Sequence, residues 1–170
     1  MSEQREDRTE AVGPELLGRM IDRHGPALRL YAGQLCDCPD DVVQDALVEL
    51  ARCQVAPRHP LAWLYRAVRF RAMSARRSAK RRKRYETESA RQRPASVTDP
   101  GAVDAQPVTA ALESLPTRQR EVVVAHIWGG LTFDQIGRLV GTSASTAHRR
   151  FKAALSAIRE KLVQSCPEKS

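Results

Sequence analysis

Apolar residues in the first half of the chain recur every three to four positions, the spacing of a helix that buries one face. The pattern predicts three helices, over residues 16–35, over residues 39–51 and from residue 60 onward. Gly25 and Pro26 predict a kink or break within the first. Pro39 and Pro60 suit the first turn of the second and third, where a missing backbone N–H costs no helical hydrogen bond. No segment alternates as a strand does, so the predicted class is all-α.

The C-terminal part of the chain has the pattern of a helix-turn-helix. Thr132 can cap a short helix, Gly141 can supply a tight turn, and Ser143 or Ser145 can cap a longer final helix. The small Gly137 predicts a close approach of these two helices. The apolar residues of the short helix are Ile136, Leu139 and Val140. In the final helix, the residues expected to hold it to the domain are Phe151, Leu155, Ile158 and Leu162.

Two shorter helices are predicted before this motif. Leu112 and Leu115 suit the first, and Pro116 with Thr117 starts the second, which ends at the glycine pair 129–130. The predicted buried side of the second consists of Val122, Val123, Ala125, His126 and Ile127.

A segment with few large apolar residues separates the two helical parts. Residues 86–108 include Pro94, Pro100, Gly101 and Pro107, and they bury too little surface to offset the entropy of ordering. We therefore expect two small helical domains joined by a flexible linker. The predicted organisation is a disordered N-terminus (1–13), a first domain (14–85), the linker (86–108), a second domain with the helix-turn-helix (109–163) and a tail (164–170).

The charges are segregated along the chain. The formal net charge is +8, from 28 Lys and Arg against 20 Asp and Glu, which favours a polyanionic partner. Residues 36–51 contain five acids and no base, whereas residues 66–84 contain ten bases and no acid. The two stretches therefore require different partners.

The final helix has the residues that a major-groove reader needs. Its cationic residues are His148, Arg149, Arg150 and Lys152. The hydroxyl residues at its start are Ser143, Ser145 and Thr146. Arginine can form paired hydrogen bonds with guanine, and hydroxyl groups at a helix start can hold phosphate. An ordinary helical hairpin with a solvated basic face is the alternative, but the register of the glycines and of the Ser-Thr pair favours DNA binding.

Three stretches of the sequence occur in a recognisable order. They are the acidic DDVVQDALVEL, the following PLAWLYRAVRFRAMSARR and, after the linker, SLPTRQREVVVAHIWGGLTFDQIGRLVGTSASTAHRRF. This order resembles the extracytoplasmic-function group of bacterial sigma factors, over residues 16–162. The resemblance implies a first domain that clamps onto core RNA polymerase and opens the −10 promoter element, and a second domain that reads the −35 element. The implied function is promoter-specific initiation of transcription.

The resemblance also assigns residues to surfaces. The implied polymerase-docking residues are Asp41, Val42, Gln44, Asp45 and Glu49, for which a solvated acidic face is the alternative. The implied −10 residues are Arg58, Trp63, Arg66, Arg69, Phe70, Arg76 and Arg77. Trp63 can either stack on an unpaired base or pack in the core. The implied −35 residues are the hydroxyl and cationic residues of the final helix, and the run from Lys80 to Arg84 is expected to hold phosphates without reading sequence.

Other function classes have weaker support. No glycine-rich phosphate loop and no HExxH or GxSxG spacing occurs, so we expect neither an enzyme nor a cofactor. The CxC spacing disfavours a zinc site built from Cys36, Cys38, Cys53 and His24 or His59, and we expect no metal. A one-component helix-turn-helix transcription regulator with a sensing first domain is the alternative function. Such a regulator would need no acidic docking helix.

The sequence also bears on compartment and partners. It contains no apolar run long enough to cross a bilayer, and its polar, acidic start does not resemble a signal peptide. Its four cysteines suit reduced thiols. We therefore expect a cytoplasmic protein, not inserted in a membrane, whose partners are core RNA polymerase and promoter DNA. An anti-sigma factor is a further partner that the resemblance allows.

Overall fold

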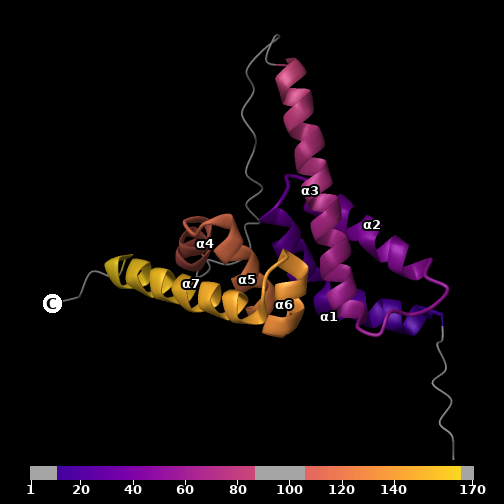
Figure 1. The fold of residues 1–170 in the computed structure, drawn as a ribbon. Coiled ribbons are helices and arrows are strands. Elements are labelled where there is room, and N and C mark those ends of the chain that lie inside the picture. Colours follow the sequence, from indigo (N-terminus) through magenta and orange to yellow (C-terminus); the bar gives the residue numbers. More distant parts are fainter. Residues whose placement is uncertain (1–10, 87–105, 166–170) are drawn as a thin grey trace, which may run out of the picture. The chain divides into compact units, whose positions relative to one another are not determined.

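A computed structural model describes residues 11–86 and 106–165 of the chain. In these two ranges every regular element is a helix, which confirms the all-α prediction (Figure 1). The helices are α1 (Pro14–Gly33), α2 (Pro39–Ala51), α3 (Pro60–Glu86), α4 (Gln106–Glu113), α5 (Thr117–Ile127), α6 (Phe133–Val140) and α7 (Ala144–Ser165). Residues 1–10, 87–105 and 166–170 lie outside the described residues, and with them most of the expected N-terminus, linker and tail.

The chain divides into two compact units, Met1–Met73 and Ser74–Ser170. The division falls within α3, whereas the sequence predicts a first domain that extends to residue 85. Helix α4 begins at Gln106, inside the segment that the sequence assigns to the linker. The predicted domain limits therefore stay a prediction. Each unit has a buried apolar core of its own.

Helix α1 corrects one expectation about the first unit. It runs through Pro26 as a single helix, so a break there is wrong, and the alternative of a kink stays a prediction. Asp22, whose backbone carbonyl loses its helical partner at Pro26, is exposed like Pro26 itself, so water can solvate that carbonyl. Gly25 and Ala27 on either side are buried, so packing holds the helix together across the proline.

The core of the first unit forms between α1 and α2, which pack against each other, and α3 contributes the buried residues of its apolar side. The rings of Tyr31 from α1 and Tyr65 from α3 lie 5.0 Å apart at an interplanar angle of 58°. Burial raises the pKa of Tyr65. The other fully buried large side chains of this unit are Leu28, Leu50, Leu64 and Val68. Because Leu64 and Tyr65 are both core residues, the opposite side of α3 is the one left for a partner.

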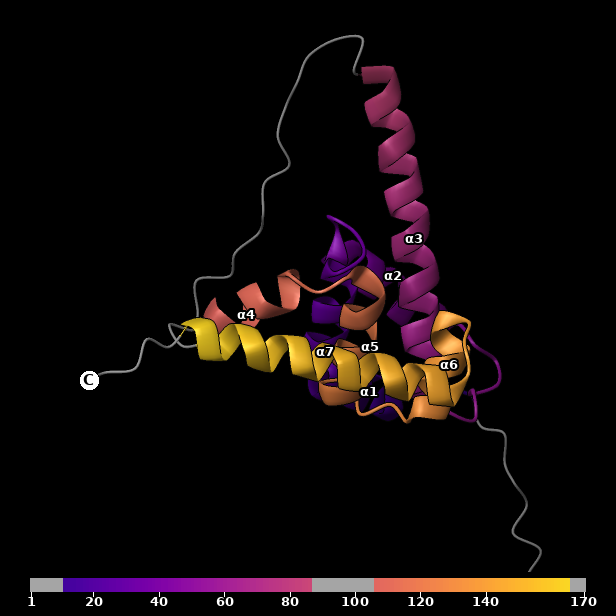
Figure 2. The same ribbon diagram turned by 60° about the vertical axis from the view of Figure 1, so that its left-hand side comes forward.

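The second unit is organised around α7. Helices α4, α5 and α6 all pack against α7, and α5 also packs against α6 (Figure 2). One buried cluster comprises Leu112, Leu115, Val123 and Ala154, with Phe151, Ala157 and Ile158 packed against it. The prediction that Phe151 and Ile158 hold the final helix to the domain is thereby confirmed.

Two apolar residues of this unit lie differently from the prediction. Ile127, expected on the buried side of α5, is 51% exposed, and Leu155 of α7 is 40% exposed. In α5 the four consecutive residues from Val122 to Ala125 are fully buried, because α6 and α7 both cover this turn of the helix. One turn of α5 is therefore buried on all sides, in place of a single buried stripe along the helix. Ile127 is the last residue of the helix and lies outside this buried turn.

The helix-turn-helix is confirmed in its details. The Thr132 hydroxyl accepts from the Gln135 backbone N–H, and the Gln135 side chain accepts from the Thr132 backbone N–H, which forms a capping box at the start of α6. Gly141 ends α6 with φ of 70°, a left-handed conformation that side chains other than glycine rarely adopt. Ser143, not Ser145, caps α7, by accepting from the Thr146 backbone N–H at 3.2 Å.

We expect Gly137→Val to lower the free energy of unfolding by about 2–3 kcal/mol. A Cβ at Gly137 would lie 2.8 Å from the Thr142 carbonyl oxygen and 3.0 Å from the Ala144 nitrogen, and both are backbone atoms that cannot turn aside. The matched control is Gly18→Val in α1, because a Cβ there meets no atom within 4 Å. Denaturant unfolding followed by circular dichroism measures both. Equal effects of the two variants would show that the α6–α7 turn has room to spare.

Candidate nucleic-acid interface and acidic docking face

The exposed side of α2 is acidic. Asp41, Gln44, Asp45 and Glu49 are exposed, whereas Val42 is 5% exposed and belongs to the core. Four of the five residues assigned to docking thus share the solvent side of one helix, whereas Val42 packs in the core on its other side. We call Asp41, Gln44, Asp45 and Glu49 the acidic face.

Arg71 of α3 connects to this acidic face. Its guanidinium donates to the Glu49 carboxylate at 2.7 Å and to the Asp45 carboxylate at 3.3 Å. Asp45 and Glu49 are one helical turn apart, so a single guanidinium reaches both. In the sequence, Arg71 stands out only as part of the basic run. The spacing of the two acids was the available signal, but nothing in the sequence identifies the cation that they share.

An apolar hollow of about 350 Å³ lies beside the acidic face, between α1 and α2. Its apolar lining consists of Leu17, Ile21, Val43, Leu47, Val48 and Ala51. Ile21 and Val48 are large apolar residues left exposed, at 44% and 42%. At its edge the Arg29 guanidinium is paired with the Asp40 carboxylate at 2.8 Å. The apolar periodicity predicts that each of these helices buries one face, and it gives no sign that part of that face stays open.

Most side chains assigned to the −10 element lie exposed in α3 or before it. Arg58, Arg66, Phe70, Arg76 and Arg77 are exposed, whereas Trp63 and Arg69 are half-buried. Phe70 is 68% exposed, which is unusual for a phenylalanine in a helix that has an apolar core side. Both roles considered for Trp63 stay open at this burial.

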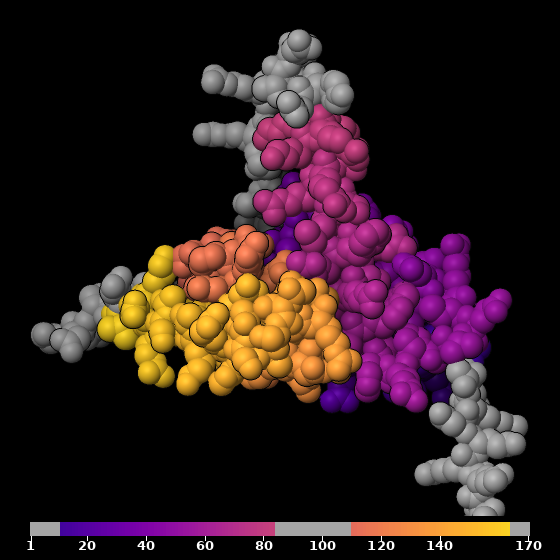
Figure 3. All heavy atoms as spheres, viewed as in Figure 1, coloured from indigo at the N-terminus to yellow at the C-terminus, as the bar shows by residue number. Residues whose placement is uncertain are grey.

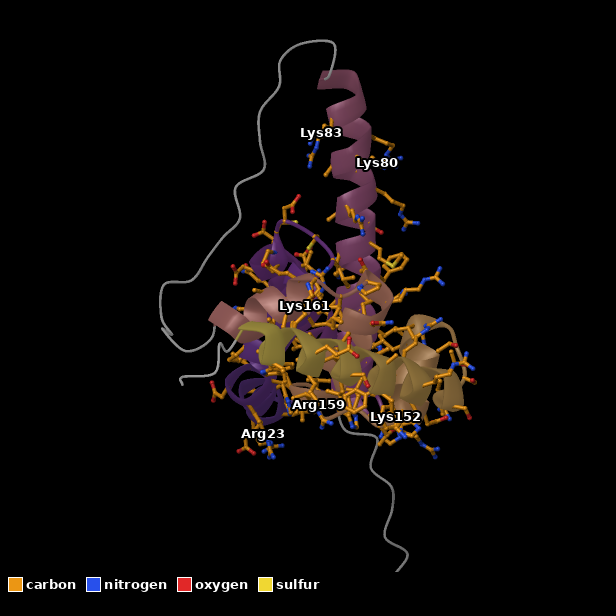
Figure 4. All side chains as sticks on the ribbon, turned by 90° about the vertical axis from the view of Figure 1, so that its left-hand side faces the viewer. Arg23, Lys80, Lys83, Lys152, Arg159 and Lys161 are labelled. Atoms are coloured by element: carbon orange, nitrogen blue, oxygen red, sulfur yellow. The ribbon has the colours of Figure 1, made fainter. Side chains whose placement is uncertain are left out.

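The C-terminal part of α3 continues the positive surface. Arg77 donates to the Ser74 hydroxyl at 3.2 Å, and Arg81 donates to the Ser78 hydroxyl at 3.3 Å. Lys80 and Lys83 extend from the same part of the helix (Figure 4). Figure 3 shows side chains of this part of α3 on the molecular surface. The exposed cations are those that a polyanion can reach without rearrangement of the helix.

The start of α7 presents the residues assigned to the −35 element. His148, Arg149 and Lys152 are exposed, and Arg150 is half-buried. Ala147, directly before His148, is fully buried and packs the helix against the domain. Ser143 and Ser145 are both exposed. The Ser143 hydroxyl caps the helix and also donates to the Thr146 hydroxyl at 3.0 Å.

Four rings join the three helices of the helix-turn-helix region. Phe133 of α6 stacks on His126 of α5, with centroids 4.3 Å apart, and contacts His148 of α7 at 4.9 Å. Phe151 contacts both Phe133, at 5.5 Å, and His126, at 4.8 Å. From the sequence alone, no role was predicted for Phe133. Its position directly after the capping Thr132 was the only sequence signal for it.

The cysteines do not form a cluster with other metal ligands in the part of the chain that the structure describes. The Cys36 thiol is buried and donates to the Ala32 carbonyl at 3.5 Å, and burial raises the pKa of this thiol to about 11. Such a thiol stays protonated at neutral pH. Within the described residues, no helix is both long enough and apolar enough to cross a membrane.

Two family models match the chain, in the order that the resemblance implied. Sigma-70 region 2 matches residues 20–82, and Sigma-70, region 4 matches residues 105–158. The ECF RNA polymerase sigma factors SigD of Mycobacterium tuberculosis and Mycobacterium bovis are 29% identical over 135 residues. That alignment covers 73% of this chain and 63% of each relative, so the chain spans less than two-thirds of the length of these curated relatives.

Solved structures show the same fold. The sigma factor RpoE from Bartonella quintana, solved with the anti-sigma factor NepR, gives a TM-score of 0.62 at 22% identity, over 85% of this chain and 95% of that one. CnrH, solved with the cytosolic domain of CnrY, gives 0.59 at 21% identity, over 91% and 92%. The two region matches together cover more than half of the sequence. The chain therefore belongs to the sigma-70 family of RNA polymerase sigma factors, in its extracytoplasmic-function group.

Proposed function

We propose that the protein binds core RNA polymerase and directs initiation at promoters that carry matching −35 and −10 elements. One observation supports this most directly: a single chain combines an acidic face on α2 with a helix-turn-helix whose final helix exposes His148, Arg149 and Lys152. A regulator that binds only duplex DNA needs the second surface and has no use for the first. A protein that joins polymerase to promoter needs both.

In this proposal the acidic face and the adjacent hollow dock on polymerase. Exposed carboxylates on Asp41, Asp45 and Glu49 attract a basic partner and orient it, while the hollow between α1 and α2 offers apolar area for side chains of that partner. The charges thus orient the partner as it approaches, and the apolar contact stabilises the complex once it has formed.

The exposed side of α3 then opens the −10 element. The exposed ring of Phe70 can stack on a base once the base leaves the duplex, and neighbouring arginines such as Arg66 can hold the phosphates on either side. Further along the helix, Lys80 to Lys83 neutralise phosphates without reading sequence. The protein thereby stabilises the opened strand by binding it.

The final helix reads the −35 element. Arg149 is exposed near the start of α7, just after the turn, and it can form paired hydrogen bonds with a guanine. Arg150 is half-buried and therefore reaches less far from the helix than Arg149. Its guanidinium is better placed to contact a backbone phosphate than a base edge.

The proposal requires no catalytic group or cofactor of this chain, because phosphodiester chemistry belongs to the polymerase. It places the protein in the cytoplasm, where core polymerase and promoter DNA are found. The structural neighbour RpoE was solved with an anti-sigma factor. An inhibitor of that kind is the further partner that we propose for this chain.

Run-off transcription tests the proposal. The purified protein, added to core RNA polymerase with a template library randomised in the −35 and −10 elements, should select and initiate at a defined set of promoters. Alone, it should bind those same duplexes weakly. Tight, specific duplex binding without polymerase, combined with no initiation, would establish the one-component regulator instead.

Asp41→Lys should weaken binding to core polymerase by about 1–2 kcal/mol, or roughly 5- to 30-fold, because it places a cation opposite a basic partner. Asp41 is preferable to Asp45, whose replacement would also break the Arg71 link. The control Glu113→Lys makes the same charge change at an exposed residue of the other unit, at the end of α4. Titration of labelled polymerase measures both variants. Equal affinities for the two would remove the acidic face from the docking site.

Arg149→Ala should reduce discrimination at one −35 position by ~1–3 kcal/mol. Arg150→Ala is the matched comparison, and it should weaken binding to all sequences alike, since phosphates carry no direct sequence information. Holoenzyme binding to cognate promoters and to every single-base −35 variant provides the comparison. If both variants lose affinity uniformly, Arg149 contacts phosphate and another residue reads the bases.

A further inference from the structure

We propose that Phe133 is a positioning residue for His148, and that it sets the base preference at the promoter position that His148 faces. This inference rests on the proposed −35 function and adds to it a residue that does not itself contact DNA. Phe133 is half-buried as the first residue of α6, and His148 is exposed in α7 among the residues assigned to the −35 element.

The ring of Phe133 contacts the imidazole of His148 directly. The two centroids are 4.9 Å apart, and the planes are tilted by 56°, which is a favourable arrangement for a pair of aromatic rings. An exposed histidine without such a contact would exchange among several rotamers. A ring pair of this kind favours one orientation by roughly 2- to 10-fold. The two imidazole nitrogens then have a defined direction relative to the bases.

Phe133 can fix the orientation of His148 because contacts with α5 and the α6 cap restrict Phe133 itself. Its ring stacks on His126, with a centroid distance of 4.3 Å and an interplanar angle of 25°. The His126 Nδ1–H donates to the Leu131 carbonyl at 2.8 Å, which fixes the plane of that imidazole since a carbonyl can only accept. The capping box at Thr132 fixes the backbone on which Phe133 sits. The orientation of His148 is thus determined from α5 through α6.

Phe151 allows this positioning role to be separated from a structural one. It contacts Phe133 at 5.5 Å and His126 at 4.8 Å, and it also packs against the buried cluster around Val123. Replacement of Phe151 therefore weakens the domain but removes neither ring of the Phe133–His148 pair.

The first test measures the ring contact itself, in the full chain and without polymerase. Phe133 should shift the imidazole proton resonances of His148 through its ring current, because the two rings are in contact. Phe133→Leu should abolish that shift, and Phe133→Tyr, which keeps the ring, should retain it. A wild-type His148 whose resonances do not respond to Phe133→Leu would overturn the proposal whatever the protein does with promoters.

The second test uses holoenzyme on a cognate promoter and on each single-base −35 variant. His148→Ala should remove the preference at one position. Phe133→Leu should reduce the preference at that same position by about 3- to 10-fold and leave the other positions unchanged. Phe133→Tyr should restore it, and Phe151→Leu, which keeps both rings of the direct pair, should change the profile less than Phe133→Leu does. In a His148→Ala background, Phe133→Leu should have no further effect on base preference.

Three results of the second test would overturn the proposal. A uniform loss with Phe133→Leu would assign this residue a purely structural role, and a continued shift of preference in the His148→Ala background would mean that Phe133 acts through another residue. If His148→Ala leaves every preference intact while the holoenzyme still selects promoters, His148 reads no base, and the proposed function survives without this inference. A wild-type protein that selects no promoter, yet shows the ring-current shift, would instead refute the proposed function.

Discussion

The close contact between α6 and the start of α7 is the constraint on which the recognition surface depends. At Gly137 a Cβ would lie 2.8 Å from the Thr142 carbonyl oxygen, so the turn fits only while this position has no larger side chain. Gly141, at φ of 70°, then redirects the chain. With the turn this tight, Phe133 reaches His148, and the exposed residues of α7 acquire a fixed direction. Sequence reading by a rigid helix needs such a fixed direction, because base-edge hydrogen bonds depend on geometry.

A second link, in the first unit, joins the two surfaces that initiation would use. Arg71 lies in α3, the helix proposed to open the −10 element, and it is paired with Asp45 and Glu49 on the acidic face of α2. These ion pairs are partly exposed and are therefore individually weak. Their consequence is electrostatic: they remove part of the negative charge that a docking partner would meet. Asp41, which precedes them in α2, is left as the most direct point of attraction for a basic surface.

The sequence predicted those features that depend on neighbouring residues. Proline in the first turn and the Thr132 cap mark helix starts because their effects act within one turn. Features that depend on distant residues were not predictable in this way. The pairing of Arg71 with two acids more than twenty residues away, and the contact of Phe133 with His148, arise only when separate helices meet. The prediction of a break at Pro26 was wrong for the same reason. Burial of the neighbouring Gly25 and Ala27 outweighs the one helical hydrogen bond that a proline removes.

Hydrogen exchange of the full-length protein, measured alone, with core polymerase and then with promoter DNA added, tests most directly the division of labour between the two surfaces. The account predicts that polymerase alone slows exchange in α2, over Pro39–Ala51, and that promoter DNA slows exchange at the start of α7 and along α3 only once polymerase is bound. Protection of α7 by duplex DNA without polymerase, with α2 unprotected in every state, would contradict it.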